Sequence, residues 1–273
     1  MKPLDLLTLA ITLTCALTIS GCTGATESTP TTNTGSTTTD TVIPNSLNQA
    51  AYIGGTVYDF GFNSIPNIPF INAPADTDFS RSAMLHDGTT YRLYFFKQAS
   101  HDTIYQFGYN AATQKYEFGF NSIPELKLTG IPTDADTNRF AMLHDGTTYR
   151  LYMKRQNDNT VMYQFGYNST SGNYEFGFNS IATLFITLAP NDADLNRWAV
   201  LHDGSTYRLY TGKTGEIDTL YQFGFNAASN DYEWGFSSIP QLQVTNMPTD
   251  SVKTNFTMLH NGSNYRFYYP SNK

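Results

Sequence analysis

The sequence predicts an all-β protein built from four repeats of 58 residues, and three observations lead to this prediction. The phrase MLHDGTTYRLY at residues 84–94 returns at 142–152 and, slightly changed, at 200–210 and 258–268. A second phrase, YDFGFNSIP at residues 58–66, returns at the same interval. The chain also contains 19 Tyr and 19 Phe residues, which favour strands packed on both faces. Each repeat is therefore expected to bury its apolar faces against its neighbours.

Four antiparallel strands are expected in each repeat. In the repeat at 138–194 these strands are residues 140–144, 148–153, 161–167 and 174–178. Asp145-Gly146 between the first two predicts a tight type I′ hairpin, in which both central residues take positive φ. Residues 154–160 are expected to be a polar loop before the third strand. Four strands per repeat is the content of one blade of a β-propeller.

The two ends of the domain predict how the fold closes. The strand that begins Tyr-Gln-Phe-Gly occurs in only three repeats, and the chain ends at Lys273 before a fourth copy. Residues 51–58 supply a short hairpin that replaces it at the other end. The last blade is therefore expected to combine strands from both termini, which removes free sheet edges. These features predict a four-bladed β-propeller at residues 47–273 rather than a linear solenoid.

The repeats resemble the hemopexin-like four-bladed propellers. The resemblance rests on Asp-Gly-x-x-Tyr-x-Leu, from Asp145 to Leu151, followed by an aromatic strand. It also rests on Phe-Asn-Ser-Ile-Pro, which leads through Gly130-Ile131-Pro132 to Asp134-Ala135-Asp136. The resemblance implies a propeller used for binding. No cofactor is firmly implied by it, and calcium or another cation in the channel is the candidate ligand.

The first 21 residues are expected to be a lipoprotein signal peptide. The apolar run at residues 6–19 is too short to span a bilayer and fits the apolar region of a secretory signal. Ile-Ser-Gly-Cys at 19–22 resembles the lipobox of bacterial lipoproteins, which implies that Cys22 is acylated and that a lipid bilayer is a partner. Thr23, rather than an aspartate, follows the cysteine, and this implies that the lipoprotein is located in the outer membrane of the bacterial cell envelope. An ordinary signal peptide with a chance cysteine is the alternative.

Residues 22–46 are rich in Ser and Thr and are expected to be a flexible tether. Of the two cysteines, Cys15 lies in the signal peptide, so the mature chain is expected to have no disulfide. The formal net charge of −7, with only 16 Lys and Arg residues, argues against a nucleic acid as partner. The common signatures of nucleophile, zinc and nucleotide sites are absent from the sequence.

The pattern Asp-x-Asp-x-x-Arg precedes the first strand of three repeats and is the main candidate for a ligand or ion site. Carboxylate oxygens suit calcium, although a complete site takes roughly 6 to 8 oxygen ligands. The alternative is structural, with each Asp capping its loop and each Arg pairing with it. Trp198 can stack on a sugar or pack in the core. The candidate residues are Asp76, Asp78, Arg81, Asp134, Asp136, Arg139, Asp192, Asp194, Arg197 and Trp198.

Two further sets of polar residues recur in the repeats. A histidine precedes each Asp-Gly or Asn-Gly turn, and the four are His86, His144, His202 and His260. They would form a metal site only if the imidazoles point to the axis, so packing against the turn is the favoured reading. Arg, Gln and acidic positions in the second, third and fourth strands are expected to satisfy one another as a ladder.

The sequence favours a binding protein over an enzyme, and it assigns no catalytic residue. The leading hypothesis is a lipid-anchored envelope protein that binds a carbohydrate or an envelope protein through one face. That face would gather the Asp-x-Asp-x-x-Arg loops and the loops between the second and third strands. A glycan-cleaving enzyme, which needs two carboxylates about 5 to 9.5 Å apart, and a purely structural envelope lipoprotein are the alternatives.

Overall fold

Twenty strands and no helix make up the described part of the chain, residues 45–63 and 65–271 of a computed structural model. The prediction of an all-β protein is therefore confirmed. Unit 1 comprises β4 (Thr77–His86), β5 (Tyr91–Lys97), β6 (Thr103–Asn110), β7 (Lys115–Phe118) and β8 (Glu125–Thr129). Unit 2 comprises β9 (Ala135–His144), β10 (Tyr149–Arg155), β11 (Asp158–Asn168), β12 (Asn173–Phe176) and β13 (Thr183–Thr187).

Unit 3 comprises β14 (Ala193–His202), β15 (Tyr207–Lys213), β16 (Glu216–Asn226), β17 (Asp231–Trp234) and β18 (Gln241–Thr245). Unit 4 combines β19 (Thr257–His260) and β20 (Tyr265–Ser271) with β1 (Ser46–Gly54), β2 (Val57–Phe60) and β3 (Asn67–Ile71). Strands β1 and β20 pair antiparallel, from Ser46 opposite Ser271 to Ala51 opposite Arg266. The expected pairing of strands from both ends of the domain is thus present.

The units are joined by hydrogen bonds as well as by packing. Short parallel pairs link β3 to β7, β8 to β12, β13 to β17 and β18 to β2. With the antiparallel pairs inside the units they form an unbroken ring that passes through β6, β7, β3, β1, β2, β18, β16, β17, β13, β11, β12 and β8. This ring leaves its strands without a free edge.

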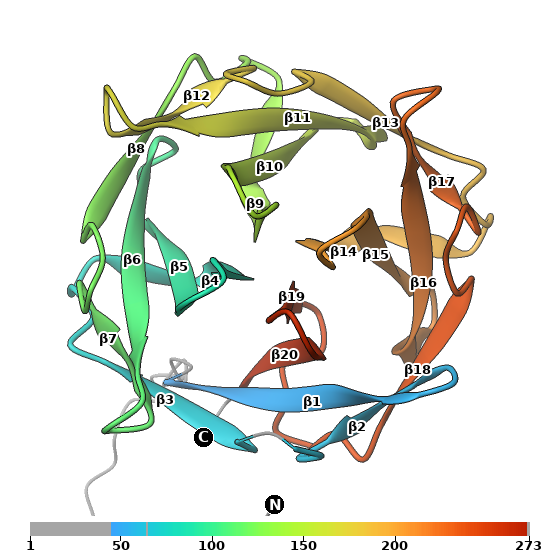
Figure 1. Cartoon of the computed structure of the whole chain (residues 1–273), viewed down its shortest axis with the longest axis horizontal. Helices are drawn as coiled ribbons and strands as arrows, with labels where there is room; N and C mark the ends of the chain where they lie inside the picture. Colours follow the sequence, from blue (N-terminus) through green and yellow to red (C-terminus); the bar gives the residue numbers. More distant parts are fainter. Residues whose placement is uncertain (1–44, 64, 272–273) are drawn as a thin grey trace, which may run out of the picture. The chain divides into compact units, whose positions relative to one another are not determined.

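The four hairpins that contain the repeated histidines lie inside this ring, with β4, β9, β14 and β19 nearest the centre (Figure 1). Four clusters of buried apolar side chains fill the space between neighbouring units. The cluster between units 1 and 2, for example, contains Tyr94 and Phe96 from one unit and Phe140 and Tyr174 from the other. Each unit therefore buries its apolar faces against its neighbours, as the repeats predict.

The structure differs from the sequence prediction in three local features. Each unit has a fifth short strand, such as β13, because the segment after Phe-Asn-Ser-Ile pairs with the strand of the next unit. The first hairpin has a four-residue loop in place of a type I′ turn, since only Gly146 takes a positive φ, of 92°. The segment at 154–160 is mostly strand with a two-residue turn, where Asn157 takes a φ of 62°.

Candidate functional site

The first Asp of each Asp-x-Asp-x-x-Arg motif accepts a hydrogen bond from a tyrosine in a strand of its own unit. The Asp76 carboxylate accepts a hydrogen bond from the Tyr105 hydroxyl at 2.8 Å and lies 3.5 Å from the Lys97 ammonium. The hydrogen bond from Tyr105 is the main cause of a pKa for Asp76 below its ordinary value. The equivalent pairs in units 2 and 3 are Asp134 with Tyr163, at 2.8 Å, and Asp192 with Tyr221, at 2.9 Å.

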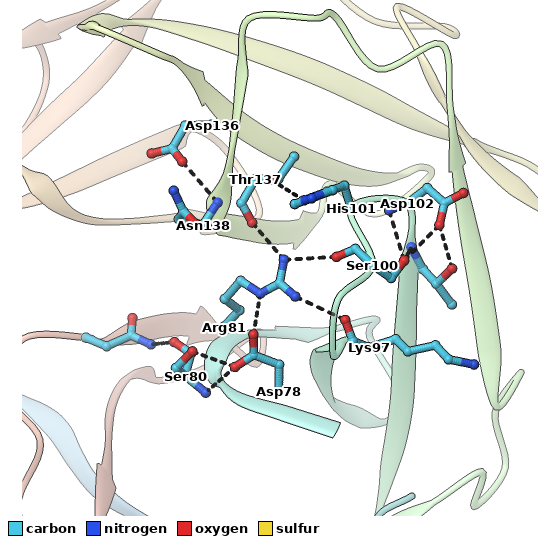
Figure 2. A network of polar contacts seen from close by, with 12 residues as sticks. Asp78, Ser80, Arg81, Lys97, Ser100, His101, Asp102, Asp136, Thr137 and Asn138 are labelled. Atoms are coloured by element: carbon cyan, nitrogen blue, oxygen red, sulfur yellow. Dashed lines mark hydrogen bonds and ion pairs between the residues drawn. The ribbon is translucent and has the colours of Figure 1, made fainter. Parts of the chain in front are cut away.

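The motif arginine of unit 1 makes the contact expected of a structural pair. Arg81 Nε lies 2.6 Å from Asp78 Oδ2. Its other nitrogens donate to the carbonyl oxygens of Lys97 and Ser100, and to that of Thr137 across the boundary with unit 2 (Figure 2). In unit 3 the matching distance, from Arg197 Nε to Asp194 Oδ2, is 3.9 Å.

Arg139, the motif arginine of unit 2, reaches towards units 3 and 4 and does not pair with Asp136. Its guanidinium donates to four carbonyl oxygens at 2.9 to 3.3 Å, those of Asn196, Trp198, Thr254 and Phe256. Burial, with Arg197 as the next cause, lowers the pKa of Arg139 to about 10. The arginine therefore ties three units together near the centre of the ring, a role that the repeated motif does not indicate.

A buried cation that sequence analysis placed in a polar loop lies beside Arg139. Lys154 is 2% exposed, its ammonium donates to the carbonyl of Leu195, and it lies 5.3 Å from the ring centroid of Trp198. Burial first, and then Arg139, lower the pKa of Lys154 well below its ordinary value. Trp198 is itself 2% exposed, so it packs in the core and offers no face to a sugar. The residues equivalent to Lys154 in units 1 and 3 are Phe96 and Gly212. This departure from the repeat is the feature of the sequence that could have pointed to Lys154.

The four repeated histidines line a cavity of only about 10 Å³ at the centre of the ring. Each imidazole packs on a tyrosine of its own hairpin, with ring centroids 4.5 to 4.7 Å apart. In three of them Nδ1 also accepts a hydrogen bond from the glycine N–H of the turn. These contacts match the expected packing against the turn.

No group of three or more His, Cys, Asp or Glu side chains among the described residues is arranged to hold a metal ion. Calcium binding by the acidic loops stays a prediction. Cys22 and the signal peptide lie outside the described residues. Within those residues, no helix has the length and apolarity needed to cross a membrane.

Four pockets lie at the boundaries between units, and no motif in the sequence predicts them. We name them A (units 1 and 2), B (units 2 and 3), C (units 3 and 4) and D (units 4 and 1); their volumes are about 350, 350, 390 and 500 Å³. They lie at the turn end of the inner hairpins, where β5 starts with Tyr91 and Arg92, whereas the acidic motifs lie at the opposite end. None of the ten candidate residues lines these pockets.

The same residue types line all four pockets at equivalent positions. In pocket B, unit 2 supplies Arg150, Tyr152 and Gln164, and unit 3 supplies Tyr207 and Tyr232. The equivalent residues are Arg92, Tyr94, Gln106, Tyr149 and Tyr174 in A; Arg208, Tyr210, Gln222, Tyr265 and Tyr58 in C; and Arg266, Tyr268, Gln49, Tyr91 and Tyr116 in D. An isoleucine from Phe-x-Ser-Ile also lines each pocket, and in B it is Ile181.

Hydrogen bonds fix the polar side chains of pocket B. Gln164 donates through Nε2 to the Tyr152 hydroxyl at 2.5 Å and accepts at Oε1 from the Ile181 N–H at 3.0 Å. Arg150 donates through Nη1 to the carbonyl of Asn179 at 2.9 Å. Because these groups are already held in place, a ligand would not have to order them on binding.

An aspartate of the hairpin turn holds the pocket arginine. Asp145 Oδ2 accepts from Arg150 Nε at 2.8 Å and from the Tyr207 hydroxyl of the next unit at 2.9 Å, while Oδ1 accepts from the N–H groups of Thr147 and Thr148. These hydrogen bonds outweigh desolvation and hold the pKa of Asp145 far below its ordinary value. The Asp145 carboxylate therefore holds the turn, the pocket arginine and the tyrosine of the neighbouring unit in place together.

We expect Asp145→Asn to lower the free energy of unfolding by about 1.5 to 3 kcal/mol at pH 7, because a charge-assisted hydrogen bond to Arg150 is lost. Since the folded pKa of Asp145 is depressed, its contribution is present above the unfolded pKa of about 3.9 and is lost as the pH falls below it. Urea denaturation at pH 7 and pH 3 measures this effect. A difference between wild type and variant that stays constant across this range would contradict it.

The predicted ladder of Arg, Gln and acidic side chains is only half present. Arg266 donates to Gln49 Oε1 at 3.3 Å, so the contact between the second and third strands forms in unit 4. The acidic position does not take part, because Glu175 accepts from Asn168 and Ser171 of its own hairpin. That part of the prediction was wrong.

No protein-family model matches the sequence, and no curated protein matches it. Among solved structures, the chain is similar to AofleA from Arthrobotrys oligospora, with 12% identity and a TM-score of 0.42 over 84% of this chain and 80% of that one. An exo-beta-1,3-galactanase from Phanerochaete chrysosporium is 12% identical, with a TM-score of 0.33 over 71% of this chain and 46% of that one. Hsv2p from Kluyveromyces lactis is 14% identical, with a TM-score of 0.25 over 54% of this chain and 38% of that one. At these values none of the three assigns a ligand or an activity to this chain.

Proposed function

We propose that the domain is a four-bladed β-propeller that binds carbohydrate in pockets A to D, one sugar unit in each. The observation that carries the proposal is the repetition of one lining of Tyr, Arg and Gln in four pockets of 350 to 500 Å³. These volumes fall in the range of small-molecule sites, about 300 to 1,000 Å³. In pocket B, Tyr152 and Tyr232 are at most 1% exposed and form the buried part of the wall. The partly exposed ring of Tyr207 can pack on the apolar face of a sugar, and the partly exposed Arg150 can donate to its hydroxyls.

Binding is favoured over glycan cleavage by the charges of the pocket walls. A glycosidase needs two carboxyl groups beside the scissile bond. No Asp or Glu is among the described residues that line pockets A to D. The aspartates of the hairpin turns are not placed to act as catalytic carboxylates. In pocket A, for example, the Asp87 side chain is 3% exposed and pairs with Arg92 at 2.7 Å. This arrangement supports a binding site with no hydrolytic role.

The sequence adds a proposed location and a way for weak sites to act together. We propose that Cys22 is acylated after removal of residues 1–21, and that the residues from Cys22 up to β1 tether the domain to a bacterial outer membrane. The predicted end of this tether at residue 46 was wrong by one residue, because Ser46 is buried and begins β1. Four weak sites on one rigid ring would engage a dense glycan at once, and such multivalency commonly raises apparent affinity by about 10² to 10⁴. A monosaccharide would then bind weakly, while a polymer bearing the same unit would bind tightly.

The test is calorimetric titration of the full-length protein in detergent with a panel of monosaccharides. The expected result is one equivalent per pocket, which makes four equivalents in total when all the sugars that bind are summed. Ile181 is 39% exposed and lines pocket B alone, so Ile181→Trp should fill that pocket and remove one equivalent. Ile217→Trp is the matched control, because Ile217 is 48% exposed and lines none of the four pockets.

Two outcomes would contradict the proposal. Absence of binding to any sugar, with a protein recovered on the immobilised domain, would favour an envelope protein as partner. Sugar binding that Ile181→Trp leaves at the same number of sites would place the ligand outside the pockets, and the acidic loops would then be examined first.

A further inference from the structure

The four pockets differ in one charge, and this difference singles out pocket D. In pockets A, B and C the arginine Nε lies 2.7 to 2.9 Å from an Asp carboxylate of the adjoining turn. In unit 4 that position is Asn261, and Arg266 has no carboxylate partner among the described residues. The described contacts of Arg266 are made through Nη1 alone, to Gln49 Oε1 at 3.3 Å and to the carbonyl of Asn63 at 2.8 Å. Its Nε and Nη2 remain as donors.

The same substitution reverses the hydrogen bond of a pocket tyrosine. In pockets A, B and C the tyrosine hydroxyl of the next unit donates to the Asp carboxylate, at 3.2, 2.9 and 3.2 Å. In pocket D the Asn261 Nδ2 donates to the Tyr91 hydroxyl at 2.6 Å. The orientation of this amide is fixed, since its Oδ1 accepts from the N–H groups of Ser263 and Asn264. Tyr91 therefore keeps its own proton for another acceptor.

Pocket D thus combines a positive charge that no carboxylate balances with an additional hydroxyl donor. It is the largest of the four pockets, at about 500 Å³, and no Asp or Glu is among the described residues that line it. Guanidinium groups bind carboxylate and sulfate oxygens through paired, charge-assisted hydrogen bonds. A neutral ligand would leave the Arg266 charge uncompensated, whereas an anionic ligand takes the place of the missing aspartate.

We propose that pocket D binds a sugar that carries an anionic group, such as the carboxylate of a uronic acid, while pockets A, B and C bind neutral sugars. This inference rests on the proposed function and adds the ligand class of one pocket. In the bound state the anionic group lies against Arg266 and accepts from the Tyr91 hydroxyl. The protein would therefore recognise glycans that contain both neutral and acidic units.

The experiment titrates the full-length protein at pH 7 with glucuronic and galacturonic acid, with glucose and galactose as neutral counterparts, and with sodium sulfate. We expect one equivalent of uronic acid per chain. Asn261→Asp restores the residue of the other three turns, and it should weaken this binding about tenfold or more. Asn230→Asp makes the same change at an exposed turn far from Arg266 in sequence, and it should leave the uronic acid equivalent in place.

A gain-of-function variant tests the same idea in another pocket. Asp145→Asn copies the turn of unit 4 in pocket B, and it should add a second equivalent of uronic acid. Its folded state is checked by the far-ultraviolet circular dichroism and by the binding that remains at pocket D. Failure to gain the second equivalent in a folded variant would count against the charge substitution as the cause.

The outcomes separate this inference from the proposed function. Uronic acid binding that Asn261→Asp does not weaken, or neutral sugar binding without any uronic acid binding, would overturn the inference and leave the proposed function standing. Sulfate binding lost in Asn261→Asp, with no sugar bound, would overturn both and reduce pocket D to an inorganic anion site. Binding of none of these probes, and of no sugar in the wider panel, would also overturn both.

Discussion

Gly166→Ala should lower the free energy of unfolding by about 3 kcal/mol, through overpacking against a rigid neighbour. Gly166 has ordinary negative φ, but a Cβ at this position would lie 2.0 Å from the carbonyl oxygen of Phe178. That oxygen belongs to the backbone after β12, so the clash cannot be relieved by moving a flexible side chain. For a domain of this size the expected fall in melting temperature is roughly 6 to 12 °C.

Gly146→Ala is the matched control for this prediction. Gly146 takes a φ of 92°, and a Cβ there would meet no atom within 4 Å. The expected cost is about 1 to 2 kcal/mol, from the left-handed backbone alone. Thermal melts of both variants make the comparison. A smaller loss for Gly166→Ala than for Gly146→Ala would show that the turn at Phe178 moves aside easily, and the close approach would then not explain why glycine recurs at 108, 166 and 224.

Lys154→Met should raise the free energy of unfolding by about 1 to 4 kcal/mol at pH 7, because a buried cation that forms no ion pair with a described carboxylate is replaced by an apolar chain of similar length. The ammonium of Lys154 is bonded to the carbonyl of Leu195, and Arg139 adds a second positive charge nearby. Its contact with the Trp198 ring recovers only part of the desolvation cost.

The pH dependence of this variant follows from the sign of the pKa change. The folded pKa of Lys154 is depressed, so the folded state binds fewer protons than the unfolded chain. The wild type therefore gains stability as the pH rises from the lowered folded pKa towards about 10.4, the ordinary value for lysine. The advantage of Lys154→Met should be largest at neutral pH and should shrink towards pH 10.

Urea denaturation at pH 7, 8.5 and 10 measures this trend, with Lys213→Met as the control. Lys213 ends the equivalent strand of unit 3 and pairs with Glu216 at 2.6 Å on the surface, so its replacement should change stability by less than about 1 kcal/mol. A loss of stability in Lys154→Met would mean that the hydrogen bond to Leu195 and the Trp198 contact exceed the cost of burial.

Much of the fold is predictable from the sequence because each unit repeats one local pattern. The alternation of aromatic and polar residues places the strands, and the turn residues separate them. The prediction failed where pairing depended on a neighbouring unit, as for β13, which pairs in parallel with β17 of unit 3. The segment Thr183–Thr187 has only five residues, and its pairing with both β11 and β17 is not visible within one repeat.

The candidate site was harder to predict, for a related reason. The acidic motifs are the most polar recurring feature of the sequence, but their first aspartates bind the tyrosines of their own units. The pocket residues are tyrosines, arginines and glutamines spread over two repeats, and each of them looks like a strand residue when it is considered alone. The substitution of Asn261 for the turn aspartate is visible in the sequence, but its meaning depends on the partner that Arg266 loses.

The sequence by itself determined the all-β class, the four units and the pairing of strands from both ends of the domain, because repetition and strand periodicity are local properties that any copy of the unit expresses. Only the tertiary structure decided that Arg150 and Tyr207 would line one pocket, that Arg139 would reach two other units and that Lys154 would be buried. These features arise between units, where side-chain positions depend on how one twisted sheet packs against the next. Packing of that kind is not encoded in the pattern of a single repeat.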